Sequence, residues 1–194
     1  MLGKNKNILL IGGAGYIGLV ISKILLKKNY KIICIYNLIY NQERPDSCIY
    51  HKNYKFINCD IRNLDKLKLI ISNINHVLIL AGLVGDPITQ RYPELSEKIN
   101  LRAIQNLFLF LNNKNIEKLI FISTCSNYGL LNNNDVANEE YELKPLSLYA
   151  KHKVANEEFL ISLKSKVDYC PTILRFSTAF GLSDRMRFDL TINQ

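Results

Sequence analysis

The sequence predicts an α/β fold built on a doubly wound parallel sheet. Short β-branched runs alternate along the 194 residues with stretches of helical periodicity, which is the pattern of βαβ units. The run 8–11 is apolar throughout and is followed at once by glycine, as in a strand buried on both faces. Polar or glycine-rich turns follow three of the runs, at the strand ends where such sheets bind their ligands.

Each element is expected from its own hydrophobic pattern. In residues 16–28, for example, Ile17, Val20, Ile21 and Ile24 recur at helical spacing and share one face. We expect strands at residues 8–11, 31–36, 54–58, 77–80, 118–123 and 169–175. We expect helices at residues 16–28, 64–72, 93–112 and 147–164.

Three of the turns should lie together in space. Crossover connections in a parallel sheet are right-handed, so the carboxyl ends of its strands share one edge. The glycine turn 12–18, the dipeptide Ala81-Gly82 and the segment 123–129 each follow a predicted strand. We therefore expect all three at one rim of the sheet.

Composition and charge exclude several classes of function. A hydrophobic content of 48% is ample for the core of one domain. The net charge is +8, but the basic residues are scattered, with no run longer than Lys27-Lys28. Such scatter does not indicate nucleic-acid binding, although a positive field favours an anionic substrate. No apolar stretch approaches the length of a membrane-spanning helix, so no membrane partner is expected.

The cysteines Cys34, Cys48, Cys59, Cys125 and Cys170 are odd in number and show no Cys-x-x-Cys spacing. We therefore expect reduced thiols, no metal site and a cytoplasmic location. Cys125 has no histidine near it in the sequence, which favours a packed loop thiol over a nucleophile.

Gly12, Gly15 and Gly18 lie between a predicted strand and a predicted helix. A glycine-rich turn that opens a helix presents free backbone N–H groups and the positive end of the helix dipole to a pyrophosphate. The same spacing also occurs in tight turns that only pack a helix onto a strand. The flanking strand and helix favour phosphate binding.

Tyr149 and Lys153 are four residues apart in a predicted helix and therefore share one of its faces. An ammonium at this distance can stabilise a phenolate and lower the pKa of the tyrosine, which suits a general acid or base. The same spacing also arises by chance on solvated helices. The phosphate-binding turn upstream favours catalysis by a nicotinamide enzyme.

Taken in order, these motifs resemble those of the extended short-chain dehydrogenase/reductases, the group that contains the NAD-dependent nucleotide-sugar epimerases and dehydratases. The resemblance covers nearly the whole chain and implies a Rossmann-like fold. The segments that carry it are Gly12-x-x-Gly15-x-x-Gly18, Asp60-Ile61-Arg62, Leu80-Ala81-Gly82, the segment 123–129, Tyr149-x-x-x-Lys153 and the segment 174–181.

The resemblance implies NAD as the cofactor. The glycine turn would hold the pyrophosphate, Asp60-Ile61 the adenine, and Ala81-Gly82 would pass beside the nicotinamide ribose. The residues implied to bind NAD are Gly12, Gly15, Tyr16, Ile17, Gly18, Asn37, Asp60, Ile61, Ala81, Gly82 and Lys153.

The resemblance also implies Thr124, Tyr149 and Lys153 as the catalytic residues and a nucleotide-sugar as the substrate. Tyr149 would exchange a proton with a sugar hydroxyl while hydride passes between that carbon and the nicotinamide. Lys153 would hold the ribose hydroxyls, and Thr124 would hydrogen-bond the reacting oxygen. Without the other motifs, Thr124 is equally an ordinary strand-end hydroxyl.

The end of the second predicted strand departs from the pattern of the family. Where an acidic residue usually binds the adenosine ribose, this chain has Tyr36 followed by Asn37. Tyrosine does not repel a 2′-phosphate as a carboxylate does. No arginine or lysine follows immediately, so NAD is favoured and NADP stays open.

Length is the second departure. Members of the group continue into a substrate domain, which we expect to be largely absent from this chain. We expect an NAD-binding Rossmann-like domain at residues 1–181 and the start of a truncated substrate-binding region at 182–194. Relatives often pair through two long helices, here 93–112 and 147–164, which predicts a homodimer.

One local feature separates the reactions of the group. The dehydratases that this chain resembles carry acidic residues directly after the catalytic threonine, where Cys125 and Ser126 stand here. Neither side chain supplies that acid–base pair, so an epimerase is favoured. The alternatives are an NAD- or NADP-dependent sugar or ketone reductase, and a cofactor-binding module without turnover.

Overall fold

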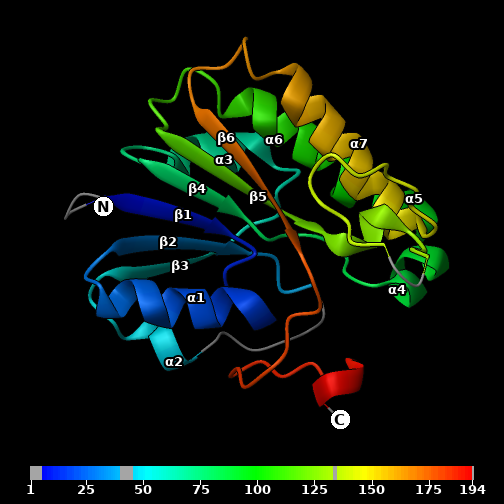
Figure 1. Cartoon of the computed structure of the whole chain (residues 1–194). Helices are drawn as coiled ribbons and strands as arrows, with labels where there is room; N and C mark the ends of the chain where they lie inside the picture. Colours follow the sequence, from blue (N-terminus) through cyan, green and yellow to red (C-terminus); the bar gives the residue numbers. More distant parts are fainter. Residues whose placement is uncertain (1–5, 40–45, 133–134, 194) are drawn as a thin grey trace.

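The computed structural model describes residues 6–39, 46–132 and 135–193. Within these ranges the chain forms a six-stranded sheet in the order β3-β2-β1-β4-β5-β6, with every neighbouring pair parallel (Figure 1). The strands are β1 Asn7–Ile11, β2 Lys31–Tyr36, β3 Tyr54–Asn58, β4 His76–Ile79, β5 Lys118–Thr124 and β6 Cys170–Phe176. The predicted doubly wound parallel sheet is therefore confirmed.

The order of the strands reverses between β1 and β4, which creates the crevice typical of doubly wound sheets. Helices cover both faces of the sheet (Figure 1). One face carries α1 Tyr16–Lys27 and α2 Asp46–Ile49. The other carries α3 Leu64–Ile70, α6 Ile104–Phe110 and α7 Leu148–Ser162. All the crossovers therefore leave the carboxyl ends of the strands at one rim.

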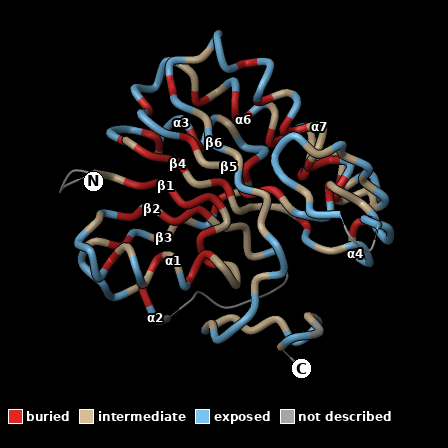
Figure 2. The backbone as a smooth tube through the Cα atoms, in the orientation of Figure 1, coloured by how far each residue is buried: buried red, intermediate tan, exposed pale blue. Residues whose placement is uncertain are grey.

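The core lies in two layers, one on each side of the sheet. Along β1 the side chains alternate: Leu9 and Ile11 join the larger cluster, and Ile8 and Leu10 the smaller one. Buried residues are concentrated in the central strands (Figure 2). Full burial of one such aliphatic side chain stabilises the fold by about 1.5–3 kcal/mol. Because β1 is buried on both faces of the sheet, every residue in the run 8–11 is apolar.

The helix expected at residues 93–112 is not a continuous α-helix. It consists of α5 Pro93–Ser96, the π-helical segment η1 Glu97–Ala103, and α6. Wider π turns are often associated with functional sites, and this one contains the buried Asn100, whose side chain bonds to the main chain after β4. Hydrophobic periodicity does not reveal this change in helix type.

Four short helical elements were not predicted, because they span too few residues to show a period. They are α2, α4 Asp86–Arg91, the 3-10 turn η2 Cys125–Tyr128 and the 3-10 turn η3 Thr191–Asn193. The longer helices end close to their predicted bounds. Two of them, α3 and α7, have a side-chain cap at the first turn, since the side chain of Asn63 accepts from Lys66 N at 2.9 Å and that of Ser147 from Ala150 N at 3.2 Å.

The two units expected from the sequence, 1–181 and 182–194, include some residues that lie outside the described ranges. These are residues 1–5, 40–45, 133–134 and 194. The division at residue 181 stays a prediction. In the described ranges no helix combines the length and apolar character needed to cross a bilayer.

Candidate active site

A cleft of about 770 Å³ opens at the carboxyl ends of the strands, within the usual size range of ligand sites. The three segments expected at one rim all contribute to its walls. Every residue that the sequence singled out for cofactor binding or catalysis lines it. These residues are Gly12, Gly15, Tyr16, Ile17, Gly18, Asn37, Asp60, Ile61, Ala81, Gly82, Thr124, Tyr149 and Lys153.

The glycine turn forms one wall and leaves room for a phosphate group. Gly12 has φ +88°, and a Cβ there would lie only 2.6 Å from the nitrogen of Ala81. A Cβ at Gly18 would lie 2.5 Å from the carbonyl oxygen of Gly13, so glycine lets α1 begin close against β1. Gly15 is the N-cap residue of α1, and no side chain caps that helix. The first N–H groups of α1 therefore suit a pyrophosphate.

The acidic turn after β3 also lines the cleft. Asp60 accepts hydrogen bonds from Asn37 Nδ2 at 2.7 Å and from Arg62 Nη2 at 2.6 Å. The hydrogen bonds from Arg62 hold the pKa of the Asp60 carboxyl below its usual value. Asp60 is therefore ionised and bonded within its own turn, and Ile61 beside it is buried. A role for these two residues at an adenine ring stays a prediction.

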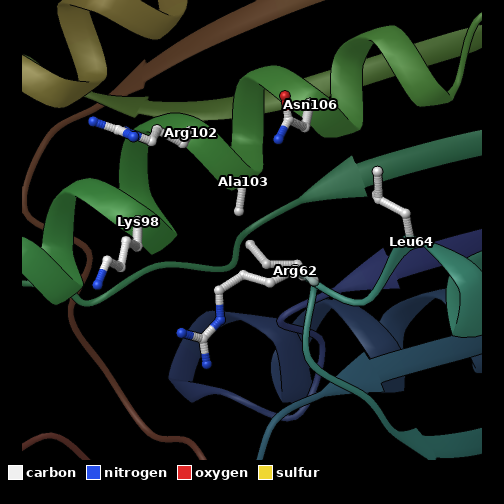
Figure 3. A pocket seen from close by; sticks show the side chains of 7 residues that line it. Arg62, Leu64, Lys98, Arg102, Ala103 and Asn106 are labelled. Atoms are coloured by element: carbon white, nitrogen blue, oxygen red, sulfur yellow. The ribbon is translucent and has the colours of Figure 1, made fainter.

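A smaller hollow of about 180 Å³ adjoins this turn and shares Ile61 with the cleft. Its walls come from the loop before α3 and from the helical stretch η1–α6 (Figure 3). Two of its cations are paired with acids, Arg62 with Asp60 and Arg102 with Glu97. Across the described part of the chain, no group of three or more His, Cys, Asp or Glu side chains is arranged to hold a metal ion.

A buried amide supports the turn after β4. Asn100 accepts from the N–H of Leu83 at 2.7 Å and donates to its carbonyl oxygen at 2.9 Å. Its own carbonyl oxygen accepts from Asn156 Nδ2 at 2.6 Å, which links η1 to α7. A Cβ at Gly82 would lie 3.1 Å from Asn100 Oδ1. The Ala81-Gly82 wall is thus held from behind by a polar contact that spans three elements.

Lys153 is buried, with 6% of its surface exposed, and lies beneath the cleft. Its Nζ donates to the carbonyl oxygen of Ile122 at 2.6 Å and lies 4.5 Å from the centre of the Phe121 ring. The distance from Nζ to the centre of the Tyr149 ring is 5.7 Å. Burial lowers the pKa of Lys153 to about 8, against the opposing effect of the Glu157 carboxylate.

The expected lowering of the Tyr149 pKa is wrong for this structure. Burial raises the pKa of Tyr149 to about 12, with Arg187 opposing the rise and Asp86 adding to it. Two facts explain the difference. Desolvation of the phenolate outweighs the nearby charges, and the ammonium of Lys153 bonds to Ile122 rather than to the phenol. Tyr149 therefore keeps its proton at neutral pH.

Thr124 ends β5 at the rim, and its Oγ1 accepts from the N–H of Ser126 at 3.1 Å as the cap of η2. A hydroxyl that accepts one hydrogen bond still has a proton to donate, so the group remains suited to hold a ligand oxygen. Cys125 is exposed and lines the cleft, so the expectation of a packed loop thiol is wrong. It follows the last residue of the strand, where the chain turns out into the cleft.

A buried ion pair that was not predicted braces this end of α7. Glu157, with 1% of its side chain exposed, accepts from Arg175 Nη2 on β6 at 2.7 Å. The same carboxylate accepts from Asn127 Nδ2 on η2 at 2.7 Å, and Arg175 Nη1 donates to the Tyr128 hydroxyl at 3.1 Å. These bonds join α7, β6 and η2 just behind Thr124 and Tyr149.

The chain after β6 forms the remaining wall. Residues 176–179 and 185–190 line the cleft, and the site residues expected from the sequence included none of them. The rule that finds ligand sites beyond the carboxyl ends of strands would have included the residues directly after β6. This tail packs on the glycine turn, since Tyr16 Oη donates to the carbonyl oxygen of Gly181 at 2.7 Å.

The family model described as "NAD dependent epimerase/dehydratase family" matches residues 8–192. A putative UDP-glucose 4-epimerase from Methanocaldococcus jannaschii is 28% identical over 176 residues, which are 90% of this chain and 56% of that protein. The chain thus spans about half the length of this relative.

Two solved structures are similar to the whole fold. The UDP-N-acetylglucosamine 4-epimerase from Methanobrevibacter ruminantium M1, in complex with UDP-N-acetylmuramic acid, has a TM-score of 0.77 and 31% identity, covering 89% of this chain and 55% of its own. The UDP-glucuronic acid 4-epimerase from Bacillus cereus, in complex with NAD, has a TM-score of 0.81 and 28% identity, covering 96% of this chain and 61% of its own. With its fold, its rim of motifs and the match over residues 8–192, the chain belongs to the NAD-dependent epimerase/dehydratase family.

Proposed function

We propose that this chain is the NAD-binding and proton-transfer part of an epimerase that acts on a nucleotide-activated sugar. The observation that carries the proposal is the convergence, in one cleft, of the glycine turn, the turns after β3 and β4, Thr124, and the Tyr149–Lys153 pair. Solved relatives of similar fold are UDP-sugar 4-epimerases, one of them in complex with NAD.

The cofactor half of the cleft fits a dinucleotide on the evidence of its glycines. Gly12 and Gly18 let the turn pack closely against the backbone of Ala81 and Gly13, and the uncapped start of α1 supplies donors for a pyrophosphate. A bound oxidised nicotinamide would supply a hydride acceptor and a positive charge in the cleft. Ala81 and Gly82 would form the wall beside it.

The proton chemistry falls to side chains of this chain. Tyr149 holds a proton at neutral pH because burial raises its pKa, so it is poised to donate that proton to a sugar oxygen. The reverse step needs cations close to the phenolate, and Lys153 and Arg187 are the candidates. Thr124 would orient the same sugar oxygen through its hydroxyl.

The reaction of the whole protein is a proposal, since the relatives are nearly twice as long as the matched part of the chain. Cys125 and Ser126 favour epimerisation over dehydration, because neither offers the acid–base pair that elimination of water needs. A homodimer through α5–α6 and α7, and a cytoplasmic location, stay predictions.

One observation favours a cofactor-binding module without turnover as the second candidate. The Lys153 ammonium bonds to Ile122 and the pKa of Tyr149 is raised, which is an arrangement that does not activate the phenol. Incubation with UDP- or GDP-sugars separates the candidates. Interconversion of epimers without net NADH supports the epimerase, net consumption of NADH with a keto sugar indicates a reductase, and binding of NAD without turnover indicates the module.

The cofactor site itself is tested by the melting temperature of the purified chain with and without NAD. Saturation at about 100 times the Kd stabilises the folded state by about 2.7 kcal/mol, so a clear upward shift is expected. Gly15→Asp is the matched variant. Gly15 is the N-cap of α1, with φ −82° and ψ −178°, where aspartate is a favoured cap.

A Cβ at Gly15 would lie 3.2 Å from the carbonyl oxygen of Gly12, so the melting curve of the variant without NAD is the check that it folds. The folded variant should lose the shift, because its carboxylate repels a pyrophosphate. Absence of any shift in the wild type at millimolar NAD would reject the proposed cofactor site.

A further inference from the structure

A series of buried hydrogen bonds runs from the back of the cleft wall to the ring of His152 on α7. Asn100, which holds the main chain of Leu83, also donates from Nδ2 to Ser96 Oγ at 3.2 Å. Ser96 Oγ in turn lies 3.2 Å from His152 Nδ1. All three side chains are buried. His152 directly precedes Lys153 in the sequence, yet it belongs to this separate set of contacts.

The donor and the acceptor of each bond follow from the chemistry of the groups. The N–H of Leu83 can only donate, so the Asn100 atom that faces it is Oδ1, and the atom that faces Ser96 is Nδ2. Ser96 Oγ therefore accepts from Asn100 and still has its own proton to donate. Among the described residues, His152 Nδ1 is the only hydrogen-bond partner that can accept this proton. The ring of His152 is thus neutral, with its proton on Nε2.

A proton on Nδ1 would reverse the last bond of the series. The ring would then donate to Ser96 Oγ, and the Ser96 hydroxyl would have to turn its proton away from His152. The proton would point at Asn100 Nδ2, which is itself a donor, or in a direction without an acceptor among the described residues. Either arrangement leaves a buried donor unmatched and destabilises the position in which Asn100 holds Leu83.

The surroundings of His152 favour the neutral ring. Burial lowers the pKa of His152 below its ordinary value of 6.5, and the Glu97 carboxylate on η1, which is paired with Arg102, opposes this effect. The other charged residues of α7 and of the elements around it leave this pKa unchanged. They are Asp86, Arg91, Glu94, Lys98, Lys118, Lys151, Lys153, Glu157, Glu158 and Arg175. The folded chain therefore takes up a second proton on this ring only as the pH falls below 6.5.

We propose that His152 is a positioning residue for the Ala81-Gly82 wall, and that protonation of its ring weakens the binding of NAD. The neutral ring orients Ser96, Ser96 orients the amide of Asn100, and Asn100 holds Leu83, which lines the cleft directly after the wall. The affinity for NAD is complete above pH 6.5 and falls as the pH drops below that value. The inference rests on the proposed cofactor site.

The protonation state of the ring is tested first, without any cofactor. Proton–nitrogen correlation NMR of the imidazole rings, recorded on the full chain, distinguishes Nδ1 from Nε2. The signal that is missing from His152→Asn identifies His152 among the three histidines. At pH 7.5 we expect a neutral ring that carries its proton on Nε2. A proton on Nδ1 at this pH would overturn the inference.

The Kd of NAD is then measured by calorimetry at pH 7.5 and at pH 5.0, with a melting curve at each pH to confirm folding. The wild type should bind NAD roughly three- to fivefold more weakly at pH 5.0, as the loss of one hydrogen bond predicts. His152→Leu offers the Ser96 hydroxyl no acceptor, so it should bind NAD weakly at both pH values.

His152→Asn is the conservative variant. Its amide oxygen can replace Nδ1 as the acceptor for Ser96, and the amide does not titrate. This variant should therefore bind NAD like the wild type at pH 7.5 and should lose the pH dependence. Because it retains His51 and His76, any effect of those two rings on the Kd persists in it.

The outcomes separate this inference from the proposed function. If NAD binds equally tightly to the wild type at both pH values, or if the pH dependence survives in His152→Asn, the inference fails while the proposed cofactor site stands. If His152→Leu folds and binds NAD like the wild type, His152 does not position the wall and the inference fails as well. If the wild type binds no NAD at either pH, the proposed function fails together with the inference.

Discussion

Lys153 and Ile122 are joined by a hydrogen bond of 2.6 Å from the buried ammonium to a main-chain carbonyl oxygen of β5. This contact fixes the ammonium under the cleft. It also explains why the two members of the Tyr149–Lys153 pair do not act on one another as their spacing suggests. Burial therefore raises the pKa of the Tyr149 phenol and lowers the pKa of the Lys153 ammonium.

The first prediction concerns the pH dependence of stability. The pKa of Lys153 falls from its ordinary value of 10.5 to about 8 on folding. Below pH 8 both the folded and the unfolded chain carry this proton, so the folded state bears the full free-energy cost of burying the charge. Between pH 8 and pH 10.5 the folded chain releases the proton first and the cost shrinks. Lys153→Met does not bear this cost. The difference in unfolding free energy between Lys153→Met and the wild type should therefore fall by about 2–3 kcal/mol between pH 7 and pH 10.

Urea unfolding at a series of pH values with reductant present measures this difference. Comparison of the two chains cancels the titration of the buried thiols, whose pKa values are also shifted. Lys151→Met, on the exposed face of the same helix, is the control and should show no such trend. A difference that stays constant with pH would mean that Lys153 is not desolvated.

The second prediction concerns the buried pair of Glu157 and Arg175. Arg175→Met leaves the Glu157 carboxylate buried without its cation and should destabilise the chain by about 3–5 kcal/mol. Chemical denaturation measures the loss. The exposed pair of Lys144 and Glu142 supplies the control, since Lys144→Met should cost less than about 1 kcal/mol.

The double variant Arg175→Met with Glu157→Gln should recover part of that loss, because it removes the buried Glu157 carboxylate that Arg175→Met leaves without its cation. Equal losses for the exposed and the buried pair would contradict a desolvated ion pair at α7.

The third prediction concerns the amide behind the Ala81-Gly82 wall. Asn100→Leu removes both hydrogen bonds to Leu83 and leaves a buried N–H and C=O unsatisfied, which should cost about 2–4 kcal/mol. The variant should also bind NAD more weakly, because the Ala81-Gly82 wall loses the hydrogen bonds that hold it. Asn106→Leu, on the same helical stretch, is a control that should change neither the stability nor the Kd by a comparable amount. An unchanged stability in Asn100→Leu would show that these bonds contribute little.

The fourth prediction concerns Tyr149 in a form of the protein that shows turnover. Tyr149→Phe removes the proton that the proposed step exchanges, so the rate of epimer interconversion should fall roughly 10²–10⁴-fold. The melting-temperature shift caused by NAD should persist. Tyr141→Phe removes a hydroxyl that bonds to Asp135 away from the cleft and should leave the rate unchanged. Full activity in Tyr149→Phe would remove this residue from the mechanism.

Much of the fold could be read from local patterns. The apolar run before Gly12 marks the central strand, and the alternation of such runs with helical faces yields the parallel sheet. Ser147 marks the start of α7 because its side chain caps the first turn. The glycine turn was recognisable because close approach of a helix to a strand excludes larger residues. Breaks that depend on tertiary contacts, such as the π segment around Asn100, leave no comparable local sign.

The chemistry of the site, like the fold, could be predicted from the sequence only in part. Residue order alone was enough to collect the walls of one cleft, because parallel strands bring the turns that follow them to one edge. The pKa of Tyr149 and the hydrogen-bond partner of Lys153 emerged only from the folded chain. Desolvation and charge effects sum over atoms that are distant in sequence, so packing, and not spacing, decides them.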